Sequence, residues 1–128
     1  MEECLQHWNT GSHRSTEMND CIFCKIAKGE IPTEFIYQDD KVMAFKDINP
    51  KAPVHILIVS KKHISEFIVL APSDNTIWDE MIKQVAELIE KFDLKNKGYR
   101  LCLNGGGAAL INHLHLHLLG GITAERKV

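Results

Sequence analysis

The sequence predicts an α+β fold, a five-stranded antiparallel sheet with one long and one short helix. Two observations carry this prediction. Five short stretches have strand patterns and are mostly joined by short loops, whereas only one stretch has the period of a long amphipathic helix. In addition, the glycine run at 105–107 precedes a strand and not a helix, so neither a dinucleotide-binding βαβ unit nor a P-loop is predicted.

Length and composition are those of one globular domain. The chain has 128 residues, of which 45% are hydrophobic and 25% are charged, which suffices for a single core. A formal net charge of -2 offers no broad basic field, so no nucleic acid polymer is expected as a partner. No run approaches the roughly 18 apolar residues of a membrane span, and the N-terminal residues lack the apolar core of a signal peptide. We therefore predict a cytoplasmic protein without a membrane partner.

The domain boundary is predicted near residue 20. Residues 1–19 show no apolar periodicity and are predicted to form a disordered tail, which leaves a domain at 20–128. Met18 would make a second plausible start.

A short helix is predicted from Asp20, which can cap it, to Gly29, which ends it. Cys21 and Cys24 are three residues apart and lie on one face of its first turn. The cysteines could be half of a zinc site, a redox dithiol or two small buried side chains, and their spacing alone does not decide. The apolar stripe of this helix consists of Ile22, Phe23 and Ile26.

The first three strands follow in quick succession. Residues 35–45 are predicted to form a hairpin around a pair of aspartates, and residues 54–60 form an apolar strand interrupted only by His55. A single histidine in a buried strand is more often a hydrogen-bonded core residue than a ligand. His63, beyond this strand, is predicted to be exposed or to cap a turn.

The long helix is predicted to begin at 72–75 and to end at 96–98, with an apolar stripe that indicates packing on the core. Residues 99–104 form the fourth predicted strand, and the glycines at 105–107 lead into the fifth. A flexible hairpin is the simpler explanation of this glycine run, and close approach of the backbone to a ligand is the other.

The fifth strand contains the most informative run, His113-Leu114-His115-Leu116-His117-Leu118-Leu119. Side chains on a strand alternate between faces, so three imidazoles share one face and three leucines the other. A solvated polar face is the alternative, but such faces normally mix residue types. Imidazoles titrate near neutral pH and suit nucleophilic or acid/base chemistry. The outer two lie about 13 Å apart along a regular strand, so the three histidines cannot all ligate one metal ion.

These residues resemble the histidine triad (HIT) nucleotide-binding family, and in particular its Hint-like purine nucleoside phosphoramidases, whose hallmark is His-x-His-x-His-x-x with apolar residues at x. The resemblance runs from about residue 20 to residue 121. It implies a HIT-like fold, a sheet continued across a homodimer, and a cleft over the triad that binds a purine nucleoside monophosphate. Besides the triad, it includes Cys-Ile-Phe-Cys-Lys-Ile at 21–26, Ile31-Pro32, Asp47-Ile48, Lys61-Lys62-His63-Ile64 and Gly98-Tyr99-Arg100.

The resemblance also implies a reaction and a role for each site residue. HIT hydrolases cleave nucleoside phosphoramidates, acyl adenylates or dinucleoside polyphosphates through a covalent nucleotidyl-histidine. By this pattern His113, His115 and His117 are catalytic, with His115 as the nucleophile that attacks the α-phosphorus and His117 in contact with the phosphate or leaving group. Asp47 would hold the ribose hydroxyls, and Asn104 would lie near the phosphate. The walls of the base pocket would be Ile22, Phe23, Ile26, Phe45 and Ile48.

Two departures from the family pattern bear on activity. The family's Gly-Gln-Ser or Gly-Gln-Thr segment before the triad is replaced by residues 107–112, which lack both glutamine and a hydroxyl. The segment after residue 121 lacks the aromatic side chain that closes the site in some relatives. The leading prediction is a purine nucleoside phosphoramidase or related nucleotidyl hydrolase. The alternatives are a dinucleoside polyphosphate hydrolase and a non-catalytic, nucleotide-binding dimeric scaffold.

Zinc is the expected cofactor, in a structural role. A structural Zn²⁺ takes four ligands, so Cys21 and Cys24 need two more, and His55 and His113 are the predicted pair. Relatives that keep the two cysteines resemble this arrangement. In the alternative, the cysteines pack in the core while His55 and His113 hydrogen-bond each other.

Overall fold

A computed structural model of the protein describes residues 21–109 and 111–123. The predicted tail at 1–19 and the predicted helix cap Asp20 lie outside these ranges and stay predictions. Within the described ranges, no helix is both long enough and apolar enough to cross a membrane.

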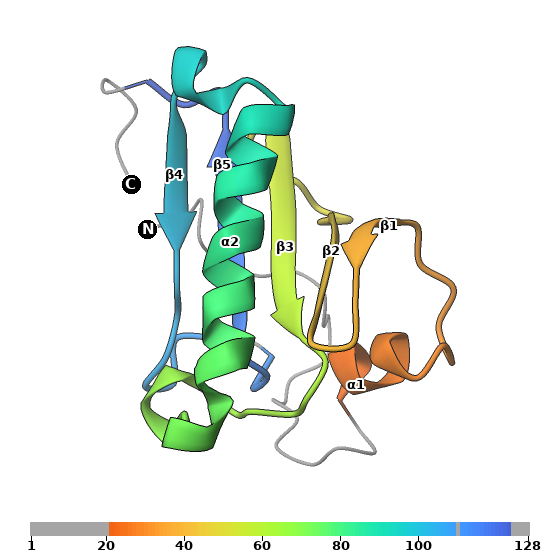
Figure 1. Ribbon diagram of the computed structural model, residues 1–128. Helices are drawn as coiled ribbons and strands as arrows, with labels where there is room; N and C mark the ends of the chain where they lie inside the picture. The colour runs from red at the N-terminus through yellow and green to blue at the C-terminus, as the bar shows by residue number, and fades with distance from the viewer. Residues whose placement is uncertain (1–20, 110, 124–128) are drawn as a thin grey trace.

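Five strands form one antiparallel sheet in the order β1-β2-β3-β5-β4 (Figure 1). This confirms the predicted fold class. The strands are β1 (Phe35–Gln38), β2 (Val42–Lys46), β3 (Val54–Ser60), β4 (Tyr99–Cys102) and β5 (His115–Gly120). The central pair is β3 and β5, which run in register from Val54 opposite Gly120 to Val59 opposite His115.

Alternation along the central strands gives the sheet two apolar faces, each covered by a different helix. The long helix α2 (Asn75–Lys91) covers the face that carries the three alternate leucines of the triad run. The short helix α1 (Ile22–Ala27) packs on the opposite face, where the β3 residues Leu57 and Val59 lie. Figure 1 shows α2 running along the sheet and α1 beside the end of the β1–β2 hairpin. Each fully buried leucine or phenylalanine contributes about 1.5 to 3 kcal/mol, so both layers stabilise the strand that carries the triad.

The helix ends differ in detail from the predicted ones. Cys21 caps α1, because its Sγ accepts the Cys24 backbone N–H at 3.3 Å. The α2 helix ends at Lys91, earlier than predicted, because Asp93 adopts a left-handed conformation (φ 54°) that breaks the helical hydrogen bonding. Gly98 then turns the chain into β4 with a φ of +84°, where any side chain would collide with the carbonyl of Ile122.

The strands next to the site are shorter than predicted. Pairing between β4 and β5 ends at Cys102 opposite His117, so β4 stops before residue 104. The β5 strand starts at His115 and not at His113, because the His113 N–H bonds to the carbonyl of Ile111 in a tight turn. His113 therefore stands just outside the regular strand, and its surroundings differ from those of the other two histidines.

Candidate active site

The three triad histidines lie on the α1 side of the sheet, as the alternation predicts. His113, His115 and His117 are nearly inaccessible, with exposed fractions of 1%, 3% and 0%. A solvated polar face is therefore contradicted. Each imidazole instead has its own buried environment.

His115 has one fixed nitrogen and one open nitrogen. Its Nδ1 lies 2.5 Å from the carbonyl oxygen of His113, a contact in which Nδ1–H donates. Its Nε2 is buried and has no hydrogen-bond partner among the described residues. Burial lowers the pKa of His115 to about 4, so the ring is neutral at neutral pH. The Nε2 lone pair is thus available for nucleophilic attack.

His117 belongs to a hydrogen-bonded chain that fixes its protonation. The Lys51 backbone N–H donates to His55 Nδ1 at 3.0 Å, so neutral His55 carries its proton on Nε2. That nitrogen lies 2.9 Å from His117 Nδ1 and 3.4 Å from Asp47 Oδ2. Burial is the main cause that lowers the pKa of His55 to about 4 and of His117 to about 2. Neutral His117 therefore presents Nε2–H as a donor.

The predicted zinc ligand His55 is wrong. Antiparallel pairing places His55 opposite Leu119, at the far end of β5 from His113. The predicted alternative, a hydrogen bond between His55 and His113, is excluded by the same register. The histidine beside the cysteines is His63, which the sequence predicted to be exposed or capping. The pairing register of β3 with β5 would have identified His63, because residues just past Ser60 must lie beside the start of β5.

Cys21, Cys24, His63 and His113 form a compact cluster whose ligand atoms all lie within 4.8 Å of one another. His113 Nδ1 lies 3.2 Å from Cys21 Sγ and 3.5 Å from Cys24 Sγ, and His63 Nδ1 lies 3.1 Å from Cys24 Sγ. His113 Nε2 lies 2.6 Å from the Ser60 carbonyl oxygen, to which it donates. Its Nδ1 lone pair therefore points at the two sulfur atoms.

The donor set of this cluster fits a zinc ion. Two thiols and two imidazoles form a common structural zinc set, and an imidazole that donates its other N–H to a carbonyl is typical of metal ligands. Burial and the neighbouring Cys21 raise the pKa of the Cys24 thiol to about 12, a shift that a bound cation would oppose. The cluster could therefore hold a metal ion.

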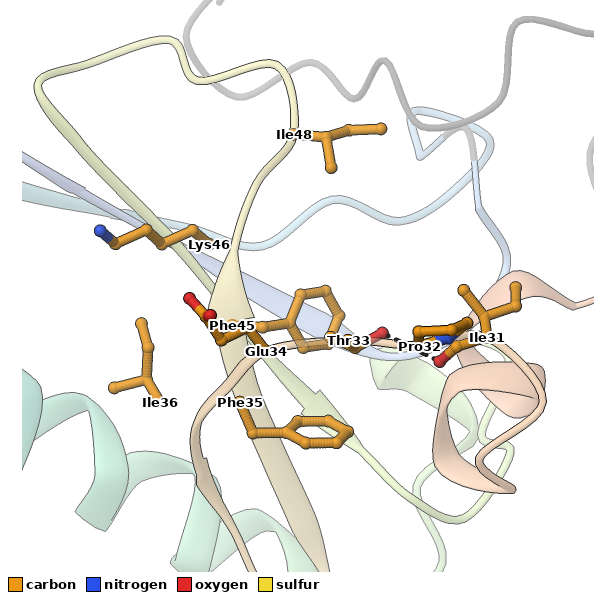
Figure 2. Close-up of a pocket in the computed structure, with 9 residues that line it drawn as sticks. All are labelled: Ile31, Pro32, Thr33, Glu34, Phe35, Ile36, Phe45, Lys46 and Ile48. Carbon is orange, nitrogen blue, oxygen red and sulfur yellow. Dashed lines mark hydrogen bonds between the residues drawn. The ribbon is translucent and has the colours of Figure 1, made fainter.

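A pocket of about 390 Å³ opens between residues 31–36 and the end of β2 (Figure 2). Phe45 and Ile48, two of the predicted base-pocket residues, line it. The helix residues Phe23 and Ile26 are instead fully buried behind it, and Ile22 is half-buried. Sequence reasoning missed several lining residues, although Ile31-Pro32 is part of the resemblance. The lining consists of Ile31, Pro32, Thr33, Glu34, Phe35, Ile36, Phe45, Lys46 and Ile48.

The two polar residues predicted near the nucleotide lie at strand ends. Asp47 directly follows β2 and is 6% exposed, with Oδ1 accepting the Asn49 N–H at 2.8 Å. Asn104 is half-buried and follows Cys102, the residue opposite His117 in the sheet. Both ends therefore border the triad face. The glycine loop beyond Asn104 is held by Glu66, whose Oε1 accepts the Gly106 N–H at 3.0 Å.

Comparison with known proteins gives the family. A family model described as scavenger mRNA decapping enzyme C-term binding matches residues 20–126. Protein HitA of Neisseria gonorrhoeae is 38% identical over 105 residues, which cover 80% of this chain and 97% of that protein. A HIT family hydrolase structure from Clostridium thermocellum matches with a TM-score of 0.78 and 43% identity, covering 85% of this chain and 96% of that one. A histidine triad nucleotide-binding protein from Candida albicans matches with a TM-score of 0.69 and 31% identity, covering 77% and 72%.

These relatives support a hydrolase or nucleotide-binding function at the coarse level. The solved structures among them also share the fold described above. The chain belongs to the histidine triad (HIT) family.

Proposed function

We propose that the protein is a nucleotidyl hydrolase that cleaves purine nucleoside phosphoramidates or related adenylates at the α-phosphorus through a covalent nucleotidyl-His115 intermediate. The observation that carries the proposal is the state of the His115 ring. Its Nδ1–H is held by the His113 carbonyl, while its buried Nε2 has no partner among the described residues. A neutral imidazole with one nitrogen fixed and the other open suits nucleophilic catalysis.

The reaction has two steps. His115 Nε2 attacks the α-phosphorus, a P–N bond forms to the imidazole, and the bond from phosphorus to the leaving amine breaks. Water then attacks the same phosphorus and releases the nucleoside monophosphate and the free imidazole. In the first step His117 Nε2–H can give the departing amine its proton, and the water of the second step returns that proton to His117, so one water is consumed per turnover. His117, with Nε2–H as a donor, can stabilise a phosphate oxygen or the leaving group.

Intact-mass spectrometry tests this function directly. The protein is mixed with an alkylamine phosphoramidate of adenosine or guanosine monophosphate and quenched in acid-free denaturant at short times. A mass increase of one nucleotidyl group together with free amine is the expected result. Turnover without any adduct would contradict the covalent route, and nucleotide binding with neither would favour the non-catalytic scaffold, for which the missing hydroxyl before the triad argues.

The ribose is proposed to bind Asp47, and this gives a prediction. Asp47→Ala should weaken binding of a purine ribonucleotide roughly tenfold but leave binding of its 2′,3′-dideoxy analogue nearly unchanged, because the ribose hydroxyls are the ligand groups that would donate to this carboxylate. Titration calorimetry with both ligands measures the difference. Asp47→Asn is the matched control, since it retains an acceptor for the Asn49 N–H while removing the charge. Equal losses for the two ligands would reject the role.

Zinc is proposed to be held by Cys21, Cys24, His63 and His113, in a structural role. When bound there it would neutralise the thiolates and cross-link α1 to the start of the triad run. The residues themselves already place α1 against the sheet, through the contacts from both cysteines to His113.

A homodimer is proposed through the β4 edge. This strand ends the sheet, and Tyr99, Leu101 and Leu103 expose 49%, 42% and 38% of their surface beside it. An open edge with apolar side chains can pair with the same strand of a second copy. Leu101→Asp is therefore expected to convert a dimer into a monomer in light scattering after gel filtration. Ile68→Asp, at a more exposed apolar position outside the sheet, is the control and should leave the dimer intact.

A further inference from the structure

One aromatic ring contacts two of the three triad histidines. The Phe23 ring centroid lies 5.1 Å from that of His115, with an interplanar angle of 67°, and 5.6 Å from that of His113, with an angle of 87°. Both are edge-to-face arrangements, the geometry that aromatic pairs prefer. Phe23 has an exposed fraction of 0%, so its ring is confined on all sides.

Phe23 does not line the pocket of about 390 Å³ that contains the predicted base-pocket residues Phe45 and Ile48. Two other rings of this aromatic group do line it, Phe45 and Phe35. The Phe45 ring lies 6.0 Å from Phe23 and 6.2 Å from Phe35. Phe45 thus has a pocket-lining position, while Phe23 lies one ring deeper, against the histidines. The predicted role of Phe23 as a wall of the base pocket does not account for this placement.

The single hydrogen bond of His115 leaves one degree of freedom. The bond from Nδ1 to the His113 carbonyl fixes one atom of the ring but not the tilt of the ring plane. The tilt decides where Nε2 points. Two rings restrict it, Phe23 at 5.1 Å and His117 at 5.0 Å. Displacement of a reacting atom by about 1 Å can cost a hundredfold in rate.

We infer that Phe23 is a positioning residue for the nucleophile: its ring fixes the plane of the His115 imidazole and so the direction of Nε2. This inference rests on the proposed function of His115. It also explains the location of α1, because Phe23 lies between Cys21 and Cys24, which contact the ring of His113. The helix therefore holds the side chain of the first triad residue and the ring plane of the second.

The test compares Phe23→Leu with Phe45→Leu. Leucine preserves apolar volume but lacks a flat face, so Phe23→Leu should slow single-turnover adduct formation at least about tenfold while the dissociation constant for a nucleoside monophosphate changes less than about twofold. Phe45→Leu should do the reverse, weakening nucleotide binding while retaining the adduct rate at saturation. Phe23→Met, with a flexible side chain that fills irregular space, is the second variant if Phe23→Leu does not fold.

A readout that needs no substrate completes the test. Nitrogen-15 NMR of the nucleotide-free parental protein should show sharp signals of one His115 tautomer, protonated on Nδ1, and Phe23→Leu should show exchange broadening of the signals of that ring alone, because its tilt is no longer fixed. Unchanged His115 signals, or an adduct rate equal to the parental one, would overturn the inference. A parental protein that forms no adduct would contradict the proposed function, and the His115 signals would still decide the role of Phe23.

Discussion

His115→Ala should lower turnover of a nucleoside phosphoramidate about a thousandfold or more and abolish the nucleotidyl adduct, since the variant lacks the Nε2 lone pair that is proposed to attack phosphorus. Nucleotide affinity should change little, because the pocket at Phe45 and Ile48 does not include this residue. Amine release and intact mass measure the two effects. Turnover near the parental rate would show that His115 is not the nucleophile.

His117→Ala is the matched control for this experiment. It removes the neighbouring imidazole, whose centroid lies 5.0 Å from His115, but keeps the nucleophile and its bond to the His113 carbonyl. The expected result is a slower reaction in which the adduct still forms. If the His117→Ala variant also forms no adduct, His117 is required for adduct formation, which would contradict its assignment as a group that only assists the reaction.

The double variant Cys21→Ser, Cys24→Ser should lose its metal and much of its stability. Protein purified without chelator is expected to contain about one zinc per chain, and the variant close to none. Metal that binds only the folded chain adds to the free energy of unfolding, so the melting temperature should fall by roughly 10 °C or more. Elemental analysis and thermal unfolding measure both quantities.

Two histidine variants discriminate between the sequence-based ligand set and the structural one. His63→Ala should lose zinc, because Nδ1 of His63 lies 3.1 Å from Cys24 Sγ. His55→Ala should retain it, because His55 bonds to His117 at the other end of β5. Metal-free parental protein that takes up no zinc and melts at the temperature of the double cysteine variant would rule the site out.

The fold was predictable because its signals are local. The alternation of side chains along residues 54–60 and around the triad determines which of them share a face of the sheet. A single amphipathic helix beside five strands then leaves few fold classes to choose from. Element ends were less predictable. The left-handed conformation of Asp93 has no signal in the residue pattern. The start of β5 depends on bonds from His113 to the Ser60 carbonyl and from Leu114 to the Ile64 carbonyl, both distant in the chain.

The site was predictable only where one strand or one motif contained it. His115 and His117 follow from their own strand, and the resemblance supplied Asp47 and Phe45. His63 required the register between two strands, which alternation alone does not reveal. The same is true of His55, whose partner His117 lies 62 residues away in the chain. Counting ligands required two more residues beside the cysteines, but it could not say which histidine the strand pairing brings near them.

The anchoring of His113 does not depend on the preceding segment alone. Its N–H donates to the Ile111 carbonyl, but its ring is held separately, through Ser60 and the two cysteines. The ring contacts come from Ser60 and from the α1 cysteines, so a change of side chains in the preceding segment leaves them in place to hold the residue whose carbonyl orients His115. The leaving-group side of the cleft can therefore depart from the family pattern, as residues 107–112 do in lacking glutamine and a hydroxyl, while the attacking nitrogen keeps its orientation.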